Sequence, residues 1–397
     1  MLNKEPEEKR VYFDWAASSP YSPGEPQERR FPYGNPSSLH REGREAKAAI
    51  EDARLRCASV LNVPPVTLYF TSGGTESNSI ALFSNLTRKG QGRVISSPAE
   101  HSSVREAMET LEKMGKPTGS ISVDSLGRVT PVDLEKAIAR HADVRFVSCM
   151  AVNNETGVIT DISALRDVIR KSSPAPHLHC DLVQAVGKIP LDIQGWEIDS
   201  ASISAHKISG PRGIGLLYLR RPSLRGESRR SALDVFYSGG GQESGIRGGT
   251  ENTQGAVELA GCLEKYADAR TVKANYARAK ERWKKLINSL SAIERCAIIP
   301  SSRTGEDARD EFSPYILQAA FKNIPGEVMA RALDDLGFAV STGSACSSSS
   351  PERPVLLAMG VPENLRIEGI RISQGWSTTD EEIDLLLDAI AEVLKFL

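Results

Sequence analysis

The feature that most constrains the fold is an alternation of short β-branched runs with stretches of helical spacing, which begins near residue 66. The intervening stretches, such as Ser77–Arg88, His101–Met114 and Ile162–Lys171, carry apolar residues at helical spacing. A repeat of strand, helix and strand predicts an α/β fold with a mainly parallel sheet that helices cover on both faces. The predicted strands are Val66–Thr71, Arg93–Ser97, Ser120–Val123, Val144–Met150, Leu178–Asp181, Ser200–Ser204 and Ile214–Leu219.

The pattern changes after two glycine clusters at residues 239–241 and 248–249. A long helical pattern runs from about Asn252 to Ser291, with Gly255 and Gly261 as weak breaks, and a smaller α+β unit follows. We expect an N-terminal arm (1–30) that packs with the small domain, a large domain (31–260) and a small C-terminal domain (261–397). The elements predicted in the small unit are strands at Ala297–Ile299, Tyr315–Phe321, Ala339–Ser341 and Ile370–Ser373, and helices at Glu327–Leu336 and Thr379–Leu394.

Charge and hydropathy exclude several classes of protein. Lys and Arg number 49 against 51 Asp and Glu, so a net charge of −2 gives no general electrostatic reason to expect nucleic acid or an anionic membrane as the main partner. The basic stretch 220–230 lacks interleaved aromatic residues, and we interpret it as a solvated surface connection. No run of about 18 apolar residues occurs and the N-terminus is polar, so we expect a soluble, cytoplasmic protein.

The six cysteines are widely spaced and never form a C-x-x-C pair. This spacing argues against a zinc site, an iron–sulfur ligand set and a disulfide framework, and we expect no metal. In a reducing compartment most of them are expected to be buried apolar residues. The cysteines are Cys57, Cys149, Cys180, Cys262, Cys296 and Cys346.

A candidate phosphate seat follows the first predicted strand of the sheet. Phe70 and Thr71 lead into a Ser-Gly-Gly turn, and a helix then begins at Gly74 and Thr75. Free backbone N–H groups, the Thr75 hydroxyl and the positive end of the helix dipole would attract an anion there. By itself the segment is better explained as a glycine turn with an ordinary cap, and its spacing matches neither nucleotide-binding motif.

Two His, a Cys and an Asp lie together at residues 177–181. Strand alternation places His177, His179 and Asp181 on one face and Cys180 on the other, and no nearby spacing supplies the further ligands that a metal needs. Asp181 lies where a parallel strand ends, at the edge of the sheet where α/β proteins bind ligands. An ionised carboxylate at that position can hold a pyridinium N–H.

A lysine lies between a buried strand and a Gly/Pro turn. Lys207 follows Ser204 and His206 and precedes the Ser-Gly-Pro-Arg-Gly turn at residues 209–213. Lysines are ordinarily solvated, but desolvation and neighbouring groups would lower the pKa of this one and suit it to a Schiff base.

In chain order, an anion seat, a carboxylate for a ring nitrogen and a reactive lysine are what pyridoxal 5'-phosphate (PLP) requires. With these three segments the chain resembles the cysteine desulfurases of the class V aminotransferase family, which are fold-type I PLP-dependent transferases. The resemblance extends from residues 12–14 (Tyr-Phe-Asp), through residues 34–40 (Gly-Asn-Pro-Ser-Ser-Leu-His), to residues 378–383 (Thr-Thr-Asp-Glu-Glu-Ile).

The resemblance implies a role for each residue of the cofactor site. Lys207 would form the Schiff base with PLP, and Asp181 would pair with the pyridinium nitrogen. His101 would stack on the ring and move protons, although by itself it is better explained as a residue that caps a helix. Asn154 and Gln184 would bind the phenolic oxygen. The phosphate would be bound by Gly74, Thr75, Ser204 and His206, together with Thr250 from the other subunit of a homodimer.

The resemblance also implies the reaction. Cys346, set among Gly and Ser residues after a predicted strand, is expected to be exposed rather than packed. It would attack the sulfur of L-cysteine and become a persulfide, leaving L-alanine, and would deliver the sulfur to an acceptor or iron–sulfur scaffold protein. Arg371 would clamp the substrate α-carboxylate with the help of Asn35.

Three other functions share part of this pattern. A selenocysteine lyase would use nearly every one of these residues. Another class V aminotransferase, or a β-eliminating enzyme, would keep Lys207 and Asp181 but would have no use for Cys346. A non-enzymatic sulfur-relay protein is disfavoured because the catalytic set is intact.

Overall fold

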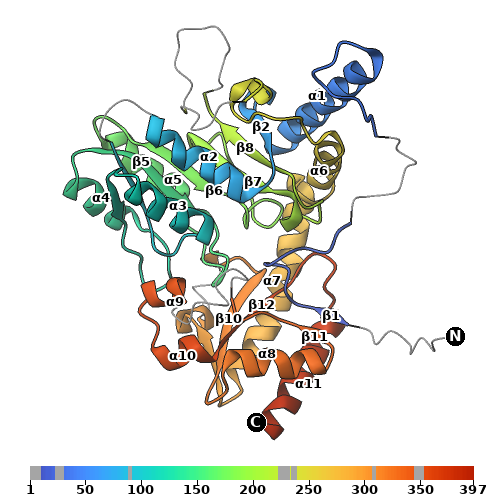
Figure 1. Ribbon diagram of the computed structural model, residues 1–397. Helices are drawn as coiled ribbons and strands as arrows, with labels where there is room; N and C mark the ends of the chain where they lie inside the picture. The colour runs from blue at the N-terminus through green and yellow to red at the C-terminus, as the bar shows by residue number, and fades with distance from the viewer. Residues whose placement is uncertain are drawn as a thin grey trace, which may run out of the picture.

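The computed structural model describes residues 10–22, 31–87, 92–221, 233, 239–305, 310–343 and 353–397. Its larger sheet has the strand order β2-β8-β7-β6-β5-β3-β4 (Figure 1). Neighbouring strands from β7 to β4 run parallel, and β8 is antiparallel to both β7 and β2. The predicted mainly parallel α/β sheet is therefore confirmed. Its strands are β2 (Leu68–Thr71), β3 (Arg93–Ser96), β4 (Thr118–Ser120), β5 (Val144–Met150), β6 (His177–Asp181), β7 (Ser200–Ser204) and β8 (Gly215–Leu219).

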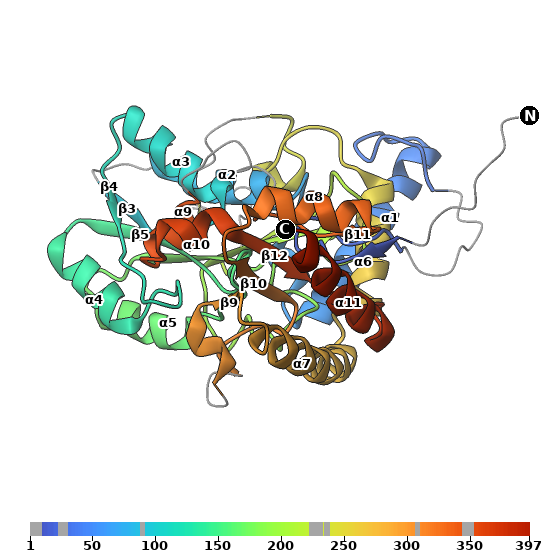
Figure 2. The same ribbon diagram turned by 90° about the horizontal axis from the view of Figure 1, so that it is seen from below.

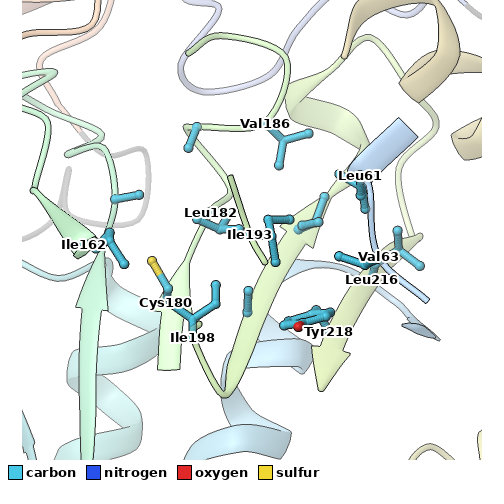
Figure 3. Packing of buried hydrophobic residues seen from close by; sticks show 14 of the residues in the cluster. Leu61, Val63, Ile162, Cys180, Leu182, Val186, Ile193, Ile198, Leu216 and Tyr218 are labelled. Atoms are coloured by element: carbon cyan, nitrogen blue, oxygen red, sulfur yellow. The ribbon is translucent and has the colours of Figure 1, made fainter. Parts of the chain in front are cut away.

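Helices cover both faces of this sheet because its strands are apolar on both sides. Phe146 of β5 and Leu217 of β8 pack in the cluster formed with α2 (Gly74–Thr87) and α3 (Ser102–Lys113). Their chain neighbours, Val147 and Leu216, pack in the opposite cluster. Figure 3 shows part of that second cluster, with the Cys180 sulfur among aliphatic side chains. The helices of this face are α1 (Arg41–Leu61), α4 (Pro131–Arg140), α5 (Ile162–Lys171) and α6 (Thr253–Tyr266).

A second, antiparallel sheet with the order β12-β10-β9 forms the smaller unit and has its own apolar core. In Figure 2 its strands lie between α7 and α8. Its elements are α7 (Ala269–Ser291), β9 (Cys296–Ile299), β10 (Ile316–Phe321), α8 (Gly326–Asp335), α9 (Pro354–Ala358), α10 (Glu363–Glu368), β12 (Gly369–Ser373) and α11 (Asp380–Phe396).

The N-terminal segment touches both units. Strand β1 (Val11–Tyr12) pairs in parallel with β11 (Phe338–Ala339), and Phe13 lies in the core of the small unit. A few residues later, Ser19 donates from both its N–H and its hydroxyl to the carbonyl oxygen of His206. The three domain ranges expected from the sequence stay a prediction.

Several predicted elements need correction. The helix expected over Asn252–Ser291 is two helices, and the break falls at residues 267 and 268 rather than at a glycine. There Asp268 caps α7 by accepting from the N–H groups of Arg270 and Thr271. The strand expected at Ser120–Val123 lies instead at Thr118–Ser120. Helices α1 and α4 were not among the predicted helices. Among the described residues, no helix is both long and apolar enough to span a membrane.

Candidate active site

A cavity of about 230 Å³ opens where strands β5, β6 and β7 end, at Met150, Asp181 and Ser204. Side chains from α2, α3, β12, the N-terminal segment and the 3₁₀ turn η2 (Ala205–Lys207) complete its wall. The structure thus gathers residues from distant parts of the chain at the sheet edge that the sequence singled out. The predicted site residues that line it are Gly74, Thr75, His101, Asn154, Asp181, Gln184, Ser204, His206, Lys207 and Arg371.

Three other predicted site residues are not among those that line this cavity. Asn35 is exposed, and its side-chain oxygen accepts from the N–H of Ser37 at 2.9 Å. Thr250 is also exposed, three residues before α6 begins. Cys346 lies outside the described residues. The roles of these three residues stay predictions.

A larger cavity, of about 580 Å³, lies between α1, β2 and residues 240–251, and none of the predicted site residues lines it. The Arg54 guanidinium in its wall is already paired, because its Nη1 and Nη2 each bind a carboxylate oxygen of Glu243 at 2.8 Å. We therefore place the candidate chemistry in the smaller cavity.

The first turn of α2 forms one end of that cavity. Gly73, at φ +150°, and Gly74 carry the chain from β2 into the helix. A Cβ atom on Gly74 would lie 2.7 Å from Cγ2 of Val183, so only glycine fits without displacing its neighbour. The sequence therefore lets a helix N-terminus approach the cavity closely, as anion binding requires.

Asp181, the last residue of β6, is 4% exposed and fixed by two hydrogen bonds. Its Oδ1 accepts from the N–H of Val183 and its Oδ2 accepts from Nδ2 of Asn78, both at 2.9 Å. Asn78 is in turn oriented by Nε2 of His179, 2.9 Å from its Oδ1. Both bonds fix the carboxyl group at the edge of the cavity, where a carboxylate can hold a protonated ring nitrogen.

Lys207 closes the opposite side of the cavity from η2. Its Nζ donates to the carbonyl oxygens of Ala16 and Ala17, at 2.6 and 2.7 Å. Burial, with the neighbouring charge of Lys207 as a second cause, lowers the pKa of His206 to about 4. His206 is therefore a neutral imidazole at neutral pH.

His101 both lines the cavity and caps α3. Its Nδ1 accepts from the N–H of Ser103 at 3.1 Å, which places the ring proton on Nε2 of the neutral form. Burial is the main cause that lowers the pKa of His101, so the neutral form is favoured. The capping and catalytic interpretations of this residue are thus compatible.

Arg371 on β12 is 1% exposed and anchored on one side. Its Nη2 donates to Oδ1 of Asp14 at 2.8 Å, and its Nη1 donates to the carbonyl oxygen of Asn154 at 3.0 Å. Among the described residues, buried Nε of Arg371 and buried Oδ1 of Asn154 have no hydrogen-bond partner. Two unsatisfied polar atoms in one buried wall indicate a polar ligand. Together with Asp181 and the N-terminus of α2, they fit PLP and a substrate carboxylate.

Sequence reasoning missed three side chains around this site: Asp14, Asn78 and Lys188. Only Asn78 carried a local signal, because it lies one helical turn after Gly74 at the mouth of the cavity. The partners of Asp14 are more than 350 residues away, beyond the reach of local pattern reasoning.

Five cysteines lie in the described part of the chain. Four are buried and Cys296 is half-buried, which confirms the expectation of packed side chains for those four. Burial raises the pKa of all five thiols, so they stay protonated at neutral pH.

His177 and His179 both bind the hydroxyl of Ser200, at 2.8 Å. The described residues contain no cluster of three or more potential metal ligands.

Comparisons with known proteins agree with this geometry. Residues 11–386 match the family described as aminotransferase class-V. The chain is 36% identical to cysteine desulfurase IscS of Shewanella oneidensis, over 96% of this chain and 92% of the relative. A solved structure of a NifS-like protein is similar, with a TM-score of 0.84 and 33% identity over 98% of this chain and 100% of that chain. The solved structure of SspA in complex with cysteine has a TM-score of 0.74 and 28% identity, over 92% of this chain and 98% of that chain. The chain belongs to the class V aminotransferase family and, within it, to the cysteine desulfurases.

Proposed function

We propose that this protein is a PLP-dependent cysteine desulfurase that converts L-cysteine to L-alanine and takes up the sulfur on Cys346. The observation that carries the proposal is the convergence of Lys207, Asp181, the N-terminus of α2 and Arg371 on one cavity. No single one of these groups identifies the reaction. Their combination, in a chain that matches cysteine desulfurases over nearly its whole length, supports it.

In this proposal the cofactor would be held at four points. Lys207 would bind it covalently and Asp181 would bind the ring N–H. The phosphate would be bound by Gly74, Thr75, Ser204 and His206, and the phenolic oxygen by Asn154 and Gln184. Bound PLP supplies an electron sink that makes the Cα proton of the substrate acidic. Ionised Asp181 keeps that sink effective because it keeps the ring nitrogen protonated.

The substrate is held through its α-carboxylate. Nε of Arg371 is the side of the guanidinium that has no partner in the described chain, while Asp14 and Asn154 restrain the other side. A carboxylate can therefore bind bidentately at Nε and the second Nη2 hydrogen without displacing Asp14. We assign Asn35 to the same carboxylate.

Lys207 and His101 are the groups that move protons. The amine of Lys207 is held next to the cavity by the carbonyl groups of residues 16 and 17, and it would accept the Cα proton of the substrate. The favoured neutral form of His101 carries its proton on Nε2, which suits it to return a proton to the product.

Sulfur transfer follows from the thiol chemistry of Cys346. The Cys346 thiolate attacks Sγ of the substrate, so that an S–S bond forms and the Cβ–Sγ bond breaks. The electron pair of the broken bond stays with Cβ, which takes up a proton and becomes the methyl group of alanine. Cys346 retains the sulfur as a persulfide for an acceptor or iron–sulfur scaffold protein.

We further propose that the enzyme is a homodimer in which Thr250 reaches the phosphate bound by the other subunit. The exposed position of Thr250, away from the cavity of its own chain, supports this arrangement. A cytoplasmic location stays a prediction from the sequence.

Two substitutions test the function in one preparation. The wild-type protein with PLP should absorb visible light and form alanine from cysteine, releasing sulfide when reductant is present. Lys207→Ala should lose the visible band, whereas Cys346→Ala should keep the band and lose at least about 99% of desulfurase turnover. Cys296→Ala is the matched control and should behave as wild type. Full turnover in Cys346→Ala would contradict the assignment of the sulfur acceptor.

A further inference from the structure

Lys188 is a lysine buried directly behind the cavity. It lies in the turn that follows β6, and its side chain is 1% exposed. Its Nζ donates to Oε1 of Gln184 at 2.5 Å. In the described part of the chain no carboxylate lies within ion-pair distance of it, in contrast to the buried Arg371, which pairs with Asp14.

Burying an amine without a carboxylate is unfavourable. Burial, followed by the positive charges of Lys207 and Arg371, places the pKa of Lys188 well below the ordinary value for lysine. His206 also lies within the electrostatic reach of Lys188. A methionine would fill the same space without this cost, so the amine is better explained by its effect on Gln184 than by packing.

The hydrogen bond from Lys188 determines which end of the Gln184 amide is which. An amine has a proton to donate whether it is charged or neutral, and the carbonyl oxygen of Ala16 on the other side of the amide can only accept, so the two contacts together place the amide oxygen next to Lys188. Nε2 of Gln184 therefore donates to the carbonyl oxygen of Ala16, at 2.8 Å. The same carbonyl accepts from Lys207, so Lys188, Gln184, Ala16 and Lys207 form one connected network.

Nε2 of Gln184 has a second N–H, and Gln184 lines the cavity. A hydrogen bond received at an amide oxygen polarises the amide and strengthens its N–H donors. A strengthened donor at the phenolic oxygen of PLP favours the deprotonated form of that oxygen.

We propose that Lys188 is a positioning residue for the cofactor. It fixes the Gln184 amide with its nitrogen toward the phenolic oxygen of PLP, and it thereby favours the deprotonated form of that oxygen. The inference rests on the proposed function, since it needs PLP in this cavity. Lys188 does not itself touch the cofactor in this account.

The test is a pH titration of the visible absorption band of the PLP-bound protein. In Lys188→Met the midpoint should rise by about 0.5 to 1 pH unit, because one oriented donor is lost. Lys188→Gln keeps a donor and should remain closer to wild type. The apo form of Lys188→Met should melt at the wild-type temperature or above it, because an unpaired buried amine has been removed.

A double substitution separates positioning from a general electrostatic effect. If Lys188 acts through Gln184, adding Lys188→Met to Gln184→Met should move the midpoint no further. A Lys188→Met midpoint equal to that of wild type would overturn the inference, as would an additive shift in the double variant. If Lys188→Met does not fold, equal midpoints in Lys188→Gln and Lys188→Ala would overturn it. A wild-type protein that gives no visible band with PLP would contradict the proposed function itself.

Discussion

The ion pair between Arg371 and Asp14 joins two residues 357 positions apart. Arg371 is 1% exposed, and the Asp14 side chain is 20% exposed. A fixed anionic partner stabilises a guanidinium buried to this extent, and removal of that partner leaves an uncompensated charge. Asp14 therefore keeps Arg371, the arginine that we propose to bind the substrate, in place before any substrate arrives.

Asp14→Ala should lower the free energy of unfolding by about 2–3 kcal/mol, because Arg371 stays buried without its counter-ion. The loss should be much smaller when Arg371→Met is already present, since no buried charge then remains to be compensated. Urea denaturation of the wild type, both single variants and the double variant measures this coupling. Additive losses would contradict the role given to Asp14.

For single residues, the sequence was sufficient to assign to the candidate site those that lie next to a strand end or a glycine turn. Asp181, Gly74 and Lys207 each had a local context that restricted their chemistry. Asp14 and Lys188 had none, because their roles depend on which distant group the fold places beside them. Long-range pairing of this kind is absent from any short window of sequence.

The N-terminus of α2 shows how one helix end depends on a neighbouring loop. The close approach of Gly74 to Val183 leaves no space for a side chain. Both residues line the cavity, so their packing determines how far the helix end reaches into it.

Gly74→Ala should weaken PLP binding by about tenfold or more, because an added methyl group in a tight contact costs about 1–3 kcal/mol. Val183→Ala removes the atom that the new Cβ would meet, so the double variant should recover much of the affinity. Titration of the apo-protein with PLP measures all three, with Val183→Ala alone as the control. Equal affinity in wild type and Gly74→Ala would show that the helix end does not bind the phosphate.

The errors in predicting helices α1, α6 and α7 have identifiable physical causes. α1 buries mostly small residues, among them Gly43, Ala46 and Ala53, so its inward face has little of the apolar bulk that marks an amphipathic helix. α6 and α7 were merged because their periodicities continue across the break. The carboxylate of Asp268, and not a glycine, ends one helix pattern and starts the next.

At the scale of the whole molecule, the proposed homodimer makes each site a product of two chains. Lys207→Ala and Thr250→Asp should each inactivate the enzyme, the first by loss of the lysine and the second by repulsion of the phosphate.

When the two variant chains are expressed together, the mixed dimer contains one site with both native residues, so activity should return to about a quarter of wild type by random pairing. Separately purified variants, mixed without subunit exchange, are the control. No recovery in a co-purified mixed dimer would contradict the role of Thr250.

The pairing of β1 with β11, and of Asp14 with Arg371, has a consequence for how the protein is made. Lys207, the proposed cofactor-binding lysine, leaves the ribosome well before Arg371, since 164 positions separate the two residues (371 − 207). At ordinary rates of translation that interval is roughly 10–30 s. For most of this interval β1 lacks its partner strand β11, and throughout it the nascent chain lacks the arginine that we propose to bind the substrate carboxylate. Under the proposed function, substrate binding therefore begins only after Arg371 has been made, so a nascent chain that has not reached this residue cannot start the reaction.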